Sequence, residues 1–293
     1  MSSIVDQKGS ITDSYRNFIA LSKYSRWIPE EVRRETWVES VDRFMTFYKK
    51  HLTENYKYDP DAPIFEEIRK AILEHEVMPS MRGLMTAGPA LTRSHIAAYN
   101  CSFINIDNVR AFDEAMFISL NGTGVGFSVE RRHVEKLPTV PEEFKDGPTI
   151  SIGDSKEDWA NSFKLLLKNL YNGVLPTWDT SLIRPAGAPL KTFGGRASGP
   201  VPIDKLFRFT IETFQKAKGR KLTSLECHDL LCFIGDVVVS GGVRRSALIS
   251  LSDLGDFEMA KAKSGNWWDT NGHRRLANNS AVYTAKPDRK SVV

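Results

Sequence analysis

Residues 99–106, YNCSFINI, and residues 122–128, GTGVGFS, are the two stretches that decide the fold of this chain. Both are short runs with aromatic and β-branched residues, bounded by turn-forming residues, which is the composition of strands. Between them, residues 111–120 have apolar positions at helical spacing and follow Asp107 and Asn108, which are suitable helix caps. A strand, a helix and a second strand in this order are typical of parallel strands in an α/β fold.

The same alternation continues along the chain. The sequence predicts four strands, at residues 102–106, 124–129, 237–239 and 247–251. It predicts helices between them, at residues 111–120, 156–171, 203–218 and 224–236. Ser155, with Asp158 three residues later, is a capping box for the second of these helices. We therefore expect an α/β fold with a largely parallel sheet.

The N-terminal part of the chain has a different pattern. From Ile11 to about Glu76, charged and apolar residues recur at helical spacing, and Pro60 and Pro63 interrupt the pattern before a second amphipathic helix at residues 64–75. We expect a helical region at residues 1–76, followed by the α/β region at residues 77–293. No repeat or clear linker separates them, so we expect one domain with a helical cap rather than two equal domains.

Composition restricts the classes of function. The chain has 293 residues, 41% of them hydrophobic, and 40 basic against 36 acidic residues give a net charge of +4. This mild excess suits anionic small molecules and is smaller than the basic face of a nucleic-acid-binding protein. Three cysteines do not make a disulfide framework, and no His/Cys cluster has metal spacing. With neither a signal peptide nor a membrane span, we expect a cytoplasmic protein without nucleic-acid or membrane partners.

Cys101 stands at the head of one predicted strand, and the glycine-rich run precedes the next. This pairing suggests a redox thiol beside a phosphate cradle, because glycines let backbone N–H groups approach phosphate oxygens. The simpler alternatives are a small buried hydrophobic residue at Cys101 and a tight helix-to-strand turn at the glycines. The run follows a helix and opens a strand, the reverse of the Rossmann order, and has no P-loop lysine. A dinucleotide-binding fold is therefore disfavoured.

Two further segments combine glycines with cations. Residues 183–200, IRPAGAPLKTFGGRASGP, indicate an ordered irregular loop, either functional or a surface connection. Residues 240–247, SGGVRRSA, follow an apolar run, and their two guanidinium groups could close over an anion or lie in a solvated turn. The isolated histidines and the two helical cysteines are better explained as core or solvated residues: His95, His133, His228, Cys227 and Cys232.

Six motifs, taken in order, resemble ribonucleotide reductase. They are MPSMR at 78–82, NC at 100–101, GTGVGFS at 122–128, FGGRASGP at 193–200, GVRRSA at 242–247 and NNS at 278–280. The fourth and fifth motifs, more narrowly, resemble the adenosylcobalamin-dependent (class II) ribonucleoside-triphosphate reductases. The resemblance covers roughly residues 15 to 285 and concerns the N-terminal part of the large, catalytic chain.

This resemblance implies the N-terminal half of a ten-stranded α/β barrel, preceded by a helical cap. The reaction would be radical reduction of ribonucleotides to deoxyribonucleotides for DNA replication, with a thiyl radical, a reducing cysteine pair and a carboxylate. Cys101 matches the first member of the reducing pair, which forms a disulfide with a partner on a later strand. Ser80 and Asn100 match residues that position the substrate. Gly124 matches the glycine whose backbone approaches the bound nucleotide.

The resemblance also implies allosteric control. Residues 240–247 match the specificity loop between effector and substrate base, and Arg244 is the residue expected to contact both; the loop positions concerned are Ser240, Gly241, Gly242, Val243, Arg244, Arg245 and Ser246. Residues 107–120 and 130–133 match the region that binds a deoxynucleoside triphosphate effector. Within it the expected effector-binding residues are Asp107, Asn108, Glu130, Arg131 and Arg132.

The sequence departs from the family after the sixth motif. The Asn-x-Cys-x-Glu segment of the radical cysteine, the second reducing cysteine and the cobalamin and shuttle-cysteine regions are not found, and residues 1–60 show no ATP-cone pattern. We expect the chain alone to be inactive and to need a second chain that carries the radical cysteine and binds most of the adenosylcobalamin, with a thioredoxin-like dithiol reductant. The substrate would be a ribonucleoside di- or triphosphate. The alternative is a catalytically inactive fragment that acts as a nucleotide-binding or interaction module.

Overall fold

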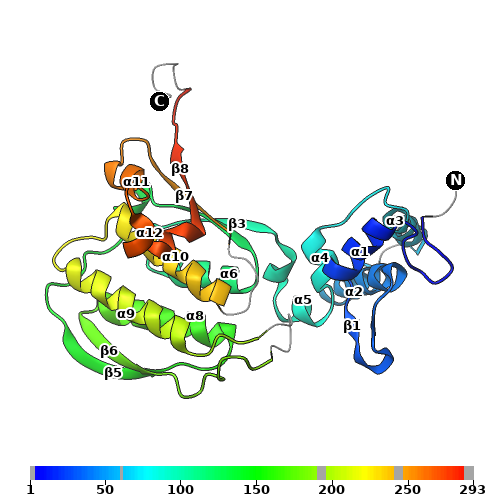
Figure 1. Cartoon of the computed structure of the whole chain (residues 1–293), viewed down its shortest axis with the longest axis horizontal. Coiled ribbons are helices and arrows are strands. Elements are labelled where there is room, and N and C mark those ends of the chain that lie inside the picture. Colours follow the sequence, from blue (N-terminus) through cyan, green and yellow to red (C-terminus); the bar gives the residue numbers. More distant parts are fainter. Residues whose placement is uncertain (1–3, 60–61, 190–195, 241–246, 287–293) are drawn as a thin grey trace. The chain divides into compact units, whose positions relative to one another are not determined.

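The computed structural model describes residues 4–59, 62–189, 196–240 and 247–286 (Figure 1). The chain divides into two compact units, Met1–Asn100 and Cys101–Val293, so the first unit extends beyond the region 1–76 expected from the sequence. Within the described ranges, no helix has the length and apolar character needed to cross a bilayer.

The first unit is mainly helical. A capping box begins its longest helix: the Thr36 hydroxyl accepts the Glu39 N–H, and the Glu39 carboxylate accepts the Thr36 N–H. A small antiparallel hairpin pairs Trp27 with Arg34, which the sequence analysis did not predict. The elements are α1 (Ser14–Lys23), β1 (Trp27–Ile28), η1 (Pro29–Glu31), β2 (Arg33–Arg34), α2 (Trp37–Tyr56), α3 (Ala62–Leu73), α4 (Met81–Thr86), α5 (Pro89–Arg93) and η2 (His95–Ala98).

The second unit contains two parallel sheets. Its elements are β3 (Cys101–Asn105), α6 (Arg110–Leu120), β4 (Gly124–Ser128), α7 (Arg131–Val134), β5 (Lys145–Ser151), α8 (Lys156–Tyr171), β6 (Val174–Asp179), α9 (Val201–Lys216), α10 (Ser224–Ser240), β7 (Leu248–Asp253), α11 (Phe257–Lys261), α12 (Trp267–Thr270), η3 (Gly272–Leu276) and β8 (Ala277–Val282). The larger sheet has the order β3-β4-β7-β8, and every neighbouring pair in it is parallel. Strands β5 and β6 form a separate parallel pair.

The larger sheet has one buried and one exposed face. Val125, Phe127 and Leu248 point into the core, where they pack with residues of α6 and α10. Alternate residues point the other way, and Phe103 and Ile249 are 55% and 47% exposed. We call this second side the open face; it also carries Cys101, which is exposed.

The expected α/β fold with parallel strands is confirmed. Helix α8 spans the predicted residues 156–171, and Ser155 and Asp158 form the predicted capping box. The prediction of a cap at Asp107 and Asn108 is wrong: the cap position of α6 is Val109, whose apolar side chain has no oxygen to accept a backbone N–H. The Asn108 amide donates to the Asp107 carboxylate at 3.0 Å.

The predicted strand at residues 237–239 is also wrong, because these residues belong to α10. Valines favour strands on a half-buried surface, but α10 is buried on nearly all sides, and Val237 and Val238 pack in the core as helical residues. The sequence analysis also missed β5, β6 and β8. Two of these contain prolines, Pro148 and Pro176, which lack the N–H needed in a ladder and obscure the strand pattern.

Candidate functional site

The first residues of β3 and β4 meet at one edge of the larger sheet. Cys101 is in register with Gly124, and the Ser102 hydroxyl donates to the Gly124 carbonyl oxygen at 3.1 Å. Because the two strands are parallel, both begin at the same edge of the sheet. The thiol and the glycine-rich run, which the sequence analysis singled out separately, are therefore neighbours.

The local structure explains why two positions of the run are glycine. Gly122 adopts a φ of +84° in the turn between α6 and β4, a conformation that side chains with a Cβ rarely adopt. A Cβ on Gly126 would lie 3.1 Å from the Phe103 ring on the open face. The helix-to-strand turn proposed as the simpler explanation is thus present, and it brings Gly124 beside Cys101.

Cys101 is the accessible thiol of the three. Cys227 and Cys232 are fully buried in α10, and burial raises the pKa of both thiols far above the ordinary value. A thiolate is the reactive form of cysteine, so these two residues are unreactive in the folded chain. Cys101 remains as the candidate for redox chemistry.

The segment expected to be the specificity loop ends at this edge. Residues 241–246 lie outside the described residues. They are Gly241, Gly242, Val243, Arg244, Arg245 and Ser246. Ser240 ends α10, and the Ala247 carbonyl accepts the Val125 N–H at 2.9 Å. The chain therefore re-enters the sheet one residue from Gly124.

The expected effector residues gather at the opposite edge of the sheet. Asp107 and Asn108 follow β3, and residues 130–132 follow β4, where the Ile106 N–H donates to Ser128 at 3.0 Å. The Lys136 ammonium lies 3.8 Å from the Asp107 carboxylate and links the two segments.

Glu130 is a buried carboxylate at this opposite edge of the sheet, which we call the second edge. Its carboxylate accepts the Ser128 hydroxyl at 2.8 Å and an Arg132 N–H at 3.1 Å. Burial alone would raise the pKa of Glu130, but these two partners outweigh it and the pKa is lowered. Arg132 is exposed at the other end of this contact, with 66% of its side chain accessible.

The sequence analysis missed Asp253. This last residue of β7 accepts the Arg131 N–H through its carboxylate at 2.6 Å and so holds α7 at the sheet edge. The available signal was topological: β7 runs parallel to β4, so an acid at its end lies beside the residues that follow β4.

Ser80 and Asn100 lie in the first unit. The Ser80 hydroxyl donates to the Ala98 carbonyl at 3.1 Å and accepts the Gly83 N–H at 3.3 Å as the N-cap of α4. A second hydroxyl, of Thr86, donates to Ala97 at 3.3 Å. Ser80 therefore ties α4 to the segment that leads to Asn100, which is itself exposed.

The comparisons with known proteins agree with the motifs. An adenosylcobalamin-dependent ribonucleoside-triphosphate reductase of Levilactobacillus brevis is 27% identical over 88% of this chain, and one of Euglena gracilis is 29% identical over 85%. The chain is similar in sequence to class II ribonucleotide reductases. It spans less than half of these relatives, 43% and 36% of their lengths. No protein-family model matches the chain.

The fold of a class II reductase also matches. A crystal structure of a B12-dependent (class II) ribonucleotide reductase superimposes with a TM-score of 0.77 at 22% identity, covering 90% of this chain and 45% of that one. The resemblance inferred from the six motifs is confirmed by these relatives, and the α/β fold with parallel strands is shared with the solved reductase.

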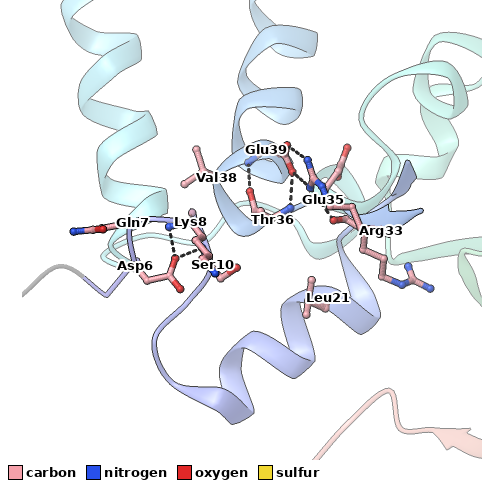
Figure 2. Close-up of a pocket in the computed structure, with 12 residues that line it drawn as sticks. Asp6, Gln7, Lys8, Ser10, Leu21, Arg33, Glu35, Thr36, Val38 and Glu39 are labelled. Carbon is pink, nitrogen blue, oxygen red and sulfur yellow. Dashed lines mark hydrogen bonds and ion pairs between the residues drawn. The ribbon is translucent and has the colours of Figure 1, made fainter. Parts of the chain in front are cut away.

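A cavity of about 1010 Å³ lies in the first unit (Figure 2). Several of its charged side chains have partners: Arg33 donates to both Glu39 oxygens, at 2.7 and 2.8 Å, and Asp6 accepts the backbone N–H groups of Lys8 and Ser10. None of the residues singled out from the sequence lines this cavity. We therefore do not assign it to the reductase site.

Across the described ranges, no group of three or more His, Cys, Asp or Glu side chains is placed to hold a metal ion. This finding concerns free metal ions, because the cobalt of a cobalamin is held by the corrin ring. We assign no described residue to the cofactor named for the relatives.

Proposed function

We propose that this chain supplies part of the active site of a ribonucleotide reductase, with Cys101 as one thiol of the reducing pair. The observation that carries the proposal is the edge where exposed Cys101 lies in register with Gly124 and where the Ala247 carbonyl accepts the Val125 N–H. The chain would form the first half of a ten-stranded barrel through residues 77–293, with the open face toward the barrel interior.

Cys101 would act as a reductant. In the net reaction the C2′ hydroxyl of the ribonucleotide leaves as water, and a hydrogen takes its place. Two thiols supply the two electrons and the two protons, and an S–S bond forms between them. The second thiol, the radical cysteine and the binding of adenosylcobalamin are assigned to a second polypeptide, and a thioredoxin-like dithiol would reduce the disulfide.

The second edge of the sheet would bind the effector. Asp107, Asn108, Glu130, Arg131 and Arg132 follow the strands at this edge, where Arg132 pairs with Glu130 and Lys136 with Asp107. Cations with backbone N–H groups suit a triphosphate. Ser80, Asn100 and Gly124 would position a ribonucleoside di- or triphosphate. Arg244 and the rest of segment 240–247 would contact substrate and effector, which gives allosteric control of substrate choice.

Reconstitution tests this proposal. The chain is mixed with a polypeptide carrying the remaining strands of a class II reductase, adenosylcobalamin, a dithiol and a ribonucleoside triphosphate, and deoxynucleotide is measured. We expect product with the wild-type chain, none with Cys101→Ser, and product again with Cys227→Ser, whose thiol is buried. Absence of product from a complex verified by size-exclusion chromatography would overturn the proposal.

A second candidate function is nucleotide binding without chemistry. It is favoured by one observation: the effector edge is assembled within the described part of the chain, whereas no cysteine there lies beside Cys101. This alternative predicts deoxynucleotide binding that is insensitive to Cys101→Ser, and no product in the reconstitution.

A further inference from the structure

Two adjacent arginines of η3 bind two aspartates of α10. Asp229 and Asp236 are two helical turns apart and lie on one face of α10. Arg274 binds Asp229, and Arg275 binds Asp236 at 2.7 Å. The two pairs differ in burial: both side chains of the first are 11% exposed, whereas those of the second are 59% and 30% exposed.

In the buried pair, all three nitrogens of the Arg274 guanidinium donate hydrogen bonds. Arg274 donates from Nε and Nη2 to the two carboxylate oxygens of Asp229, at 2.7 and 2.6 Å, and from Nη1 to the Ala262 carbonyl at 2.7 Å. His273 lies 3.3 Å from the same carboxylate, and its ring packs 4.6 Å from the Phe233 ring of α10. A planar guanidinium held at all three nitrogens fixes orientation as well as distance.

This pair lies directly before an edge strand. Arg274 precedes Ala277, the first residue of β8, and among the described residues β8 pairs with one strand, β7. Asn278 follows on the open face, in register with Ile249, and through it with Gly126 and Phe103. The position of Asn278 thus depends on β7 and on the anchor at Arg274.

We propose that Asp229 and Arg274 are positioning residues that couple helix α10 to strand β8. Helix α10 leads into residues 240–247, and η3 leads into β8. A movement of α10 must carry η3 with it, because separating the pair would leave two buried charges without partners. A ligand that restrains α10 would therefore also restrain β8 and Asn278.

Hydrogen exchange of the intact chain tests the anchor. We expect Asp229→Asn to speed exchange of the β8 amides by about tenfold or more, with the amides of β3 and β4 unchanged. The matched control Asp236→Asn, which breaks the exposed pair, should change them by less than about twofold. Leu167→Ala on α8, with a similar loss of thermal stability, separates a local effect from general destabilisation. Equal exchange of β8 in Asp229→Asn and wild type, or the same pattern in Leu167→Ala, would refute the anchor.

The same exchange experiment with a nucleotide added tests the coupling, which rests on the function proposed above. With a deoxynucleoside triphosphate added, we expect protection of both residues 224–247 and β8 in the wild type, and of residues 224–247 alone in Asp229→Asn. Protection of β8 in both proteins would overturn the coupling. If the nucleotide protects no segment of the wild type, the proposed function and the coupling both fail, while the ligand-free comparison still decides the anchor.

Discussion

Cys101 and the two cysteines of α10 differ in exposure, and this difference predicts their reactivity. Under native conditions one thiol per chain should react rapidly with a disulfide reagent such as DTNB, because Cys227 and Cys232 are fully buried and burial raises their pKa values. In a denaturant all three should react. Thiol release followed by absorbance measures both stages.

The matching variants identify the thiol concerned. Cys101→Ser should abolish the fast native reaction and leave two thiols in denaturant, whereas Cys232→Ser should keep the fast reaction. A fast native phase that persists in Cys101→Ser would show that the buried cysteines become accessible, and the assignment of Cys101 as the redox residue would lose its basis.

The burial of His228 predicts that the protein loses stability in acid. Its ring is fully buried between the Ser250 hydroxyl, 3.0 Å from Nδ1, and the Cys232 thiol, 3.5 Å from Nε2. Burial lowers the pKa of His228 to about 4. In the unfolded chain the pKa is the ordinary 6.5, so between these values the unfolded chain binds the extra proton. The free energy of unfolding should fall by about 1.4 kcal/mol per pH unit from this group as the pH drops.

Urea unfolding at several pH values measures this effect. His228→Gln should be less stable at pH 7 and should lose less stability than the wild type between pH 6.5 and pH 4. His95→Gln, at an exposed position, should keep the wild-type slope. An unchanged slope in His228→Gln would mean that His228 titrates alike in both states.

At the scale of elements, helix α2 allows a threonine at its N-cap, Thr36, to be compared with a threonine in its interior, Thr53. Thr36→Ala removes the side-chain half of the capping box at the start of α2 and should lower the free energy of unfolding by about 1 kcal/mol. Thr53, in the same helix, donates only to the Lys49 carbonyl one turn earlier. Thr53→Ala should be neutral or slightly stabilising, since alanine favours the helix interior. Equal effects of the two substitutions in urea unfolding would contradict the cap.

Elements with a strong local signal could be predicted from the sequence. Helix α8 has both amphipathic spacing and a capping box, and its residues were predicted without error. Helix α10 was predicted to end at Asp236 because the valines that follow resemble a strand, and the helical packing that decides the matter comes from distant residues. Strand β8, ANNSAV, has an exposed polar composition that lacks a strand pattern, and its pairing with β7 determines it.

The candidate site was predictable to the extent that it follows strand order. Cys101 and the glycine run lie at the starts of neighbouring parallel strands, so a correct strand assignment places them together. Asp253 could have been found in the same way, because it ends β7, which is parallel to β4. The Asp229–Arg274 pair was not predictable from strand order. Its two residues are separated by 45 positions, and only the folded chain shows that they meet.

For the whole second unit, the parallel sheet separates two sets of residues. Cys101 and Gly124 lie where β3 and β4 begin, and Asp107, Glu130 and Asp253 lie where strands end. The five residues of β3 span about 13 Å between its ends. If the proposed roles hold, a substitution at the Cys101 edge should leave effector binding at the other edge unchanged, which a single shared pocket would not allow.

Ligand-linked stability tests this separation. A deoxynucleoside triphosphate at 100 times its dissociation constant should stabilise the chain by about 2.7 kcal/mol, and Cys101→Ser should keep this gain in full. Arg132→Ala should lose most of this ligand-linked stabilisation, because we propose that the exposed Arg132 guanidinium, beside Glu130, binds the triphosphate. Lys168→Ala, which removes an exposed positive charge from α8, controls for net charge. If thermal unfolding shows the same gain in Arg132→Ala as in Lys168→Ala, the effector does not bind at this edge; if Cys101→Ser abolishes the gain, the two edges are not independent.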